Sequence, residues 1–190
     1  MVPSVLTATL AKSWAYFKDQ LEASAWNRLQ VVLADLTLAA DFDRLLATSE
    51  FFRDQFIRHR DWALTELEAG RLFRCSDLEG ESWEDALSQL VLDNASEDAV
   101  MSALRVFRNR QMLKIVAGEL SGRVTLSETF QALTQLADIT IQFSVRWSTA
   151  KLSQRFGHAV GEWSGEPQEL VVLGMGKLGG GELNQSSDID

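Results

Sequence analysis

The sequence predicts a mainly α-helical protein whose last residues begin a segment of a different kind. Two prolines occur, Pro3 and Pro167, and none interrupts the chain between them, so nothing in that stretch forbids long helices. Five of the twelve glycines fall within residues 174–181, directly after a short apolar run. We therefore divide the chain into a helical bundle over residues 1–165 and a separate segment over residues 166–190.

The composition is that of a globular protein with an acidic balance. The 190 residues include 18 Lys and Arg against 27 Asp and Glu, a formal charge of −9. This balance argues against nucleic-acid binding, because phosphate neutralisation needs clustered basic residues. No basic leader precedes the first apolar stretch and no apolar run reaches about 18 residues, so we expect neither secretion nor a membrane span. The single Cys75 cannot form an internal disulfide, and we expect a cytoplasmic protein.

Helices are expected along the first part of the chain, because apolar residues recur three or four positions apart. Shorter helices are predicted over residues 4–20, 22–40, 42–56, 60–69 and 82–92, and two longer ones over residues 100–120 and 126–147. The last begins with a capping-box pattern, since Thr125 is followed three residues later by Glu128. Gly118 and Gly122 lie at the break before it, where a left-handed C-terminal cap often falls.

Most conspicuous side chains in the helical part have a structural explanation. Arg105, Arg108 and Arg110 are suited to contact a phosphate or an acidic partner, but a solvated helix face is the better interpretation. Cys75 has no nearby histidine, so we expect it to pack in the core rather than act as a nucleophile. Neither of the two histidines has a second His or Cys at ligand spacing, which argues against a metal site there.

The character of the chain changes near residue 157. Residues 157–169 hold three glycines and the second proline, a composition typical of a linker or long loop. Residues 170–173, Leu-Val-Val-Leu, predict a short buried strand. The crowded glycines of residues 174–181 follow, and glycine at that density indicates a backbone that turns sharply or approaches a ligand closely.

Three phosphate-binding patterns compete for these glycines. Gly174, Gly176 and Gly179 spell the dinucleotide-binding fingerprint after a strand, which keeps an NAD-type oxidoreductase open as a third choice. That fold normally begins with this unit, whereas here a long helical region precedes it. A Walker A loop is excluded because Lys177 is followed by leucine rather than serine or threonine. The third pattern includes the residues that come next.

Asp188 and Asp190 lie two positions apart, which on a strand places both carboxylates on one face. Like charges on one face repel unless a divalent metal lies between them and a phosphate. Two-metal phosphoryl-transfer sites hold their ions about 3.5–4 Å apart, a spacing that such a pair serves. A glycine turn at Gly176 followed twelve residues later by Asp188 is the layout of a nucleotidyltransferase active site.

At these residues the sequence resembles a known family. The string LVVLGMGKLGGGELNQSSDID, residues 170–190, is similar to the signature of bacterial bifunctional glutamine synthetase adenylyltransferase/adenylyl-removing enzymes, and the helical segment 104–156 is similar to the region before their first catalytic domain. The family carries two nucleotidyltransferase domains of the DNA polymerase β type. The resemblance implies a mainly α helical bundle followed by the truncated start of an α+β nucleotidyltransferase domain.

The resemblance also implies roles for individual residues. Asp188 and Asp190 would be catalytic and would hold Mg²⁺. The nucleotide and its phosphates would contact Gly176, Gly179, Gly180 and Ser187. Lys177 and Glu182 lie within the motif, but the resemblance gives neither a role.

The context of Asn184 and Ser186–Ser187 resembles the N-terminal half of the family enzymes. That half removes AMP from an adenylylated tyrosine of glutamine synthetase, using inorganic phosphate and releasing ADP, while the other half attaches AMP from ATP. The implied partners are glutamine synthetase, a nitrogen-signalling PII-type protein and a nucleotide, with no nucleic acid and no membrane.

The sequence stops at Asp190, in what the resemblance makes the middle of a catalytic strand. The family uses a third carboxylate on a later strand, so we expect a fragment that is inactive alone. The alternative is a helical regulatory or docking module that binds glutamine synthetase or a nitrogen-signalling protein.

Overall fold

The computed structural model describes residues 4–75, 82–91 and 95–187. After a 3₁₀ turn over Ser4–Leu6, its helices are α1 (Thr7–Gln20), α2 (Ala23–Val32), α3 (Leu36–Thr48), α4 (Glu50–Arg58), α5 (Arg60–Glu68), α6 (Trp83–Leu90), α7 (Glu97–Ser121), α8 (Leu126–Phe156) and α9 (Gly176–Gly179). The prediction of a mainly α-helical protein is confirmed. Within the described ranges no helix is both long and apolar enough to cross a membrane.

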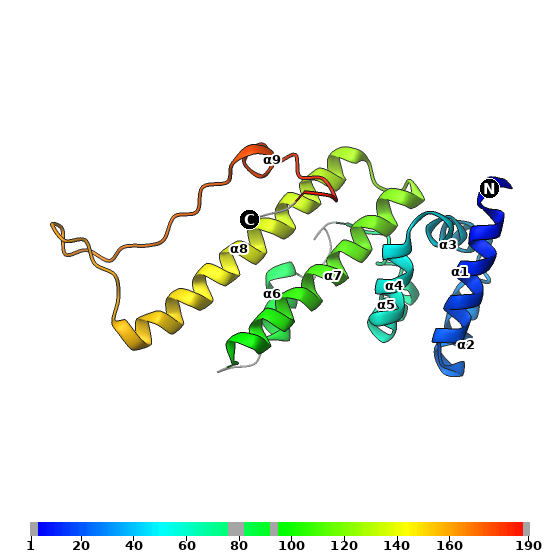
Figure 1. Cartoon of the computed structure of the whole chain (residues 1–190), viewed down its shortest axis with the longest axis horizontal. Coiled ribbons are helices and arrows are strands. Elements are labelled where there is room, and N and C mark those ends of the chain that lie inside the picture. Colours follow the sequence, from blue (N-terminus) through cyan, green and yellow to red (C-terminus); the bar gives the residue numbers. More distant parts are fainter. Residues whose placement is uncertain (1–3, 76–81, 92–94, 188–190) are drawn as a thin grey trace.

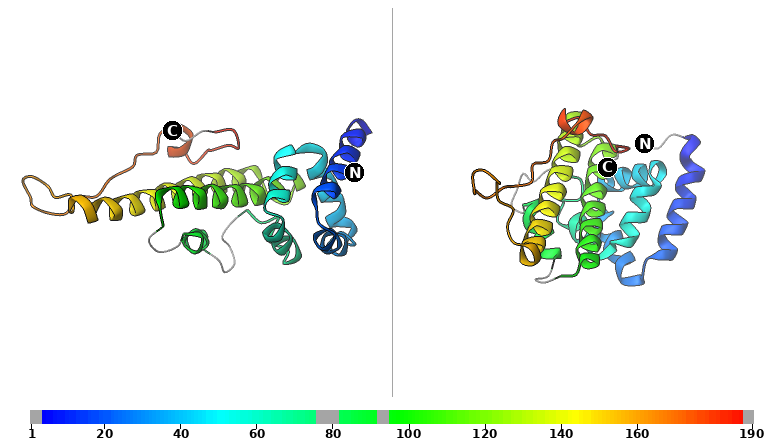
Figure 2. Two further views of the ribbon diagram at one scale, coloured as in Figure 1. Left: turned by 60° about the horizontal axis from the view of Figure 1, so that its bottom comes forward. Right: turned by 60° about the vertical axis from the view of Figure 1, so that its left-hand side comes forward.

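Helices α7 and α8 form a long antiparallel pair, and α1 to α5 gather around the end where α7 stops (Figure 1). Helix α7 contacts α3, α4, α6 and α8. The tail leaves the opposite end of α8 and returns along the pair. It lies on one side of α7 and α8, while α6 lies on the other (Figure 2).

Two hydrophobic clusters form the core, and α7 contributes to both. The first joins α1 to α5 with α7 and is rich in phenylalanine, including Phe17, Phe42, Phe52 and Phe56. The second joins α6, α7 and α8 and includes Trp83, Phe107 and Leu136. Leu113 of α7 lies in the first cluster and Ile115 in the second. Two residues span about 200° around a helix, so they face opposite neighbours.

Two of the predicted helices are each divided in the structure, so those boundaries were wrong. The segment predicted as 22–40 breaks before Asp35, whose carboxylate accepts hydrogen bonds from the backbone N–H groups of Thr37 (2.8 Å) and Leu38 (3.1 Å). The segment predicted as 42–56 breaks at Ser49, whose Oγ accepts from Phe52 N at 3.0 Å. Each side chain satisfies donors that a new helix leaves unpaired, and so begins one.

The turn from α7 to α8 has the predicted caps. Gly122 ends α7 in the left-handed conformation at φ 77°, and Thr125 and Glu128 complete a capping box at the start of α8. Gly118 was also predicted at the break between the two helices, but it lies within α7. A Cβ there would lie 2.6 Å from Val124 Cγ2 and 3.0 Å from Phe73 O. Its missing side chain allows the chain after the turn to pack closely.

The tail differs from the prediction of a strand. Residues 170–173 are in no strand, and their side chains are half to four-fifths exposed. A strand needs a hydrogen-bonding partner along its edge, and none pairs with these residues within the described chain. The isolated bridge between Val160 and Pro167 instead closes a loop earlier in the tail. The strand predicted at 170–173 is therefore wrong for this structure.

Candidate nucleotide-binding turn

The glycine-rich segment forms a compact turn around α9. Its backbone carries hydrogen bonds from Gly180 N to Gly176 O (3.0 Å) and from Glu182 N to Lys177 O (2.8 Å). The C-terminal cap of α9 is Gly180. The sequence prediction of a sharp backbone turn at these residues is confirmed.

The glycines are required for different reasons. Gly176 and Gly181 have φ of 55° and 68°, values that favour glycine. Gly179 lies against Gly174, and a Cβ on Gly179 would collide with the Gly174 carbonyl oxygen. Gly180 has an ordinary φ of −84°, and a Cβ there would come no closer than 3.4 Å to Gly176 O. Gly180 is therefore the one predicted phosphate-contacting glycine that the turn itself does not require.

Ser187 belongs to a second small turn organised by Asn184. The Ser187 hydroxyl donates to Asn184 Oδ1 (2.8 Å) and accepts from Asn184 N (3.2 Å). Ser186 Oγ also donates to Asn184 Oδ1, at 3.2 Å. Ser187 lines a groove between α7 and α8, and Gly176, Gly179 and Gly180 are not among the residues that line that groove. Ser187 therefore does not share this groove with the three predicted glycines.

The tail between these turns is attached to the helical pair. Leu183 is 4% exposed and lies in the second hydrophobic cluster, against which Leu178 also packs. The Gln185 amide donates to the Glu119 carboxylate of α7. These contacts were missed from the sequence, because the single apolar residue Leu183 gives no periodic signal.

The remaining predicted site residues lie outside the described part of the chain. Asp188 and Asp190, the proposed catalytic and Mg²⁺-binding pair, fall after residue 187. Among the described residues, no group of three or more His, Cys, Asp or Glu side chains could hold a metal ion. Lys177 and Glu182 are both exposed on the glycine turn. The Mg²⁺ site stays a prediction from sequence.

A helical region joined to this turn and to the Asp-x-Asp string is the organisation expected of a nucleotidyltransferase. The family model for glutamate-ammonia ligase adenylyltransferase matches residues 39–190. The match covers most of the helical bundle, the glycine turn and the acidic pair. The chain belongs to this family.

Individual relatives carry the fuller name bifunctional glutamine synthetase adenylyltransferase/adenylyl-removing enzyme. The chain is 42% identical to one from Pseudomonas aeruginosa over 170 residues, covering 90% of this chain and 17% of the relative. It is 36% identical to one from Nitrosococcus oceani over 189 residues, and 33% identical to one from Pseudomonas putida over 198 residues; each alignment covers 100% of this chain and 19% of the relative. The chain thus spans less than a fifth of the length of these relatives.

Proposed function

We propose that this chain forms part of the adenylyl-removing half of an enzyme that controls glutamine synthetase. The observation that carries the proposal is the unbroken string from Gly174 to Asp190, which combines the glycine turn with the acidic pair inside the family match. The name of the relatives, which includes an adenylyl-removing activity, supports it. The proposed division is a helical region over residues 1–165 and the start of a nucleotidyltransferase domain over 166–190.

The proposed reaction cleaves the bond between the AMP phosphorus and a tyrosine oxygen of glutamine synthetase. Inorganic phosphate attacks that phosphorus, ADP forms, and the tyrosine oxygen leaves and takes up a proton. Asp188 and Asp190 would hold Mg²⁺, which when bound neutralises charge on the phosphates. The turn at Gly176, Gly179 and Gly180 would admit the phosphates close to the backbone, and the Asn184–Ser187 turn would fix the approach to the acidic pair.

A chimaeric enzyme tests whether this chain belongs to the adenylyl-removing half or to the adenylylating half. We would replace the matching fifth of the Pseudomonas aeruginosa relative with this chain and assay both reactions. Asp188→Asn is expected to abolish phosphate-dependent ADP release from adenylylated glutamine synthetase and to leave ATP-dependent adenylylation intact, since the two reactions use separate sites. Asp138→Asn, the same substitution at an exposed position of α8, is the matched control and is expected to leave both reactions intact. Loss of adenylylation with retained ADP release would contradict the assignment.

The chain by itself is expected to give no turnover. Residues 170–173 are exposed and unpaired in the described structure, so the sheet that would position the acidic pair is not formed there. Phosphate-dependent ADP release by the purified 190-residue chain, abolished by Asp188→Asn, would overturn this expectation.

A docking module is the second candidate, and α8 provides the observation that favours it. The last turns of α8 extend beyond the bundle (Figure 1), where Leu152 and Phe156 are 55% and 69% exposed. We would titrate the chain with glutamine synthetase and with a PII-type protein. Binding that Phe156→Ser weakens, without ADP release, favours the docking module. No binding to either protein counts against it.

A further inference from the structure

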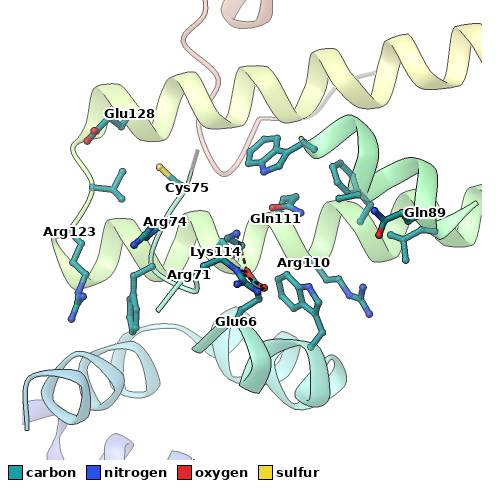
Figure 3. Close-up of a pocket in the computed structure, with 17 residues that line it drawn as sticks. Glu66, Arg71, Arg74, Cys75, Gln89, Arg110, Gln111, Lys114, Arg123 and Glu128 are labelled. Atoms are coloured by element: carbon teal, nitrogen blue, oxygen red, sulfur yellow. Dashed lines mark hydrogen bonds and ion pairs between the residues drawn. The ribbon is translucent and has the colours of Figure 1, made fainter. Parts of the chain in front are cut away.

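A second cavity lies on the helical bundle, away from the glycine turn. It has a volume of about 570 Å³ and is bordered by α5, the segment after α5, α6, α7, the turn after α7 and the start of α8 (Figure 3). None of residues 170–187 lines it. Pockets of about 300–1,000 Å³ are the usual size for small-molecule sites.

Basic side chains outnumber acidic ones among the described residues that line this cavity. Five cationic side chains line it: Arg71, Arg74, Arg110, Lys114 and Arg123. Two carboxylates, Glu66 and Glu128, are among the described residues that line it. Aromatic rings of Trp62, Phe73, Trp83 and Phe107 form much of the rest of its wall. Low-dielectric walls strengthen the field of such a cluster.

Both carboxylates are already used by the fold. Glu66 is 6% exposed and accepts hydrogen bonds from Arg71 Nε (3.1 Å) and Lys114 Nζ (3.2 Å). Glu128 accepts from Thr125 in the capping box. Arg123 is held by Asp41 of α3, at 2.8 Å. These contacts hold three of the cationic side chains of the wall, Arg71, Lys114 and Arg123.

No carboxylate of the described chain pairs with Arg110, another cation of the wall. It makes no ion pair and no side-chain hydrogen bond there, and its Nε is buried without a partner. Its guanidinium carbon lies 5.2 Å from the centre of the Trp62 ring, a distance at which a cation–π interaction forms. A buried guanidinium N–H without an acceptor is costly. The sequence analysis placed Arg105, Arg108 and Arg110 on a solvated face; Arg105 and Arg108 are exposed, whereas Arg110 is partly buried.

Neighbouring groups on α7 add to the same wall. Gln111 is 6% exposed, and its side-chain oxygen is also buried without a partner. Lys114 lies one helical turn after Arg110, so both cations project from the same side of α7. Like charges four residues apart repel, and Glu66 neutralises only Lys114 of the two.

We propose that this cavity binds a small metabolite through an oxyanion, a carboxylate or a phosphate, with Arg110 as the residue that binds the anion. The planar guanidinium donates two parallel hydrogen bonds to such a group. The aromatic wall covers the rest of the ligand. The site is independent of the proposed transferase function, since it shares no residue with the glycine turn.

Calorimetric titration of the 190-residue chain at constant ionic strength tests the site with inorganic phosphate and with succinate. At least one anion is expected to bind with a Kd of about 1 mM or tighter. Arg110→Gln is expected to weaken that binding at least about tenfold, the usual effect of losing a charged hydrogen bond. Binding of phosphate alone assigns the site to phosphate esters, and binding of succinate alone assigns it to carboxylates.

Arg108→Gln is the matched control, because Arg108 is exposed, lies on the same helix and lines the other groove. It removes the same charge and is expected to leave the Kd unchanged. Should Arg110→Gln fail to fold, Arg110→Lys keeps the charge without the planar fork and is expected to weaken binding measurably. Failure of both anions to bind, or equal weakening by the Arg108 and Arg110 substitutions, would overturn the proposal.

Discussion

Gly118 shows how one missing side chain fixes the packing of two distant segments. It lies inside α7, where glycine is normally less stable than alanine, yet its hydrogen position faces Val124 and the backbone of Phe73. Close packing therefore outweighs helix propensity at this residue. Periodicity in the sequence could not show this close packing, because Phe73 lies 45 residues before Gly118 in the chain.

Gly118→Ala is expected to destabilise the protein by about 1–3 kcal/mol, because the new methyl group would displace backbone as well as the Val124 side chain. Urea denaturation followed by circular dichroism measures the change. Ser102→Ala, at an exposed position of the same helix, is the control and is expected to stabilise by a few tenths of a kcal/mol. Stabilisation by Gly118→Ala would show that the close approach does not exist.

His59 makes folding stability depend on pH. Burial lowers its pKa from 6.5, and the charges of Arg110 and Arg58 lower it further; its Nε2 is buried without a partner. As the pH falls below 6.5, the unfolded chain takes up the proton first, so the free energy of unfolding falls. The stabilising contribution of neutral His59 is complete above pH 6.5. It is lost as the pH falls toward the lower pKa that His59 has in the folded protein.

Denaturation curves measured between about pH 7.5 and 5.5 are expected to show a free energy of unfolding that decreases as the pH is lowered. His59→Gln is expected to reduce this dependence on pH, because glutamine does not titrate. His158→Gln, at an exposed position of the tail, controls for the loss of an imidazole. A slope that His59→Gln leaves unchanged would assign the pH dependence to other groups.

At the scale of elements, local signals predicted helix ends better than continuous periodicity predicted helix lengths. The capping box at Thr125 begins α8 where the sequence placed it. The breaks at Asp35 and Ser49 were missed because the apolar repeat continues through both caps. The strand at residues 170–173 was predicted from composition, but a strand forms only with a partner, which composition does not specify.

Ser49 provides a test of how much a single cap contributes. Ser49→Ala removes the acceptor for Phe52 N and is expected to cost about 1 kcal/mol of stability. Ser49→Asp restores an acceptor at the same position and is expected to recover most of that loss. Equal destabilisation by both substitutions, in urea melts, would show that the hydroxyl acts through packing rather than as a cap.

At the scale of the whole molecule, α7 is the element that joins both clusters and both candidate sites. The sequence predicted the glycine turn correctly, because the φ of Gly176 and the contact of Gly179 are local requirements. It did not predict that Arg110 is partly buried, since that depends on how α5 and α6 pack beside α7. Nor could it predict that the tail returns to the helices, because the partners of Leu183 lie on α7 and α8.

The attachment of the tail is expected to depend on Leu183. Leu183→Ala removes most of a side chain that is 4% exposed and should cost about 2 kcal/mol of docking free energy. The detached population would then rise about 30-fold. Hydrogen exchange at the amides of residues 178–187 should accelerate accordingly, while α7 and α8 keep their protection. Leu170→Ala, at a position that is 68% exposed, should change neither the docking free energy nor the exchange rate of these amides. Unchanged exchange in Leu183→Ala would mean that the polar contact between Gln185 and Glu119 holds the tail instead.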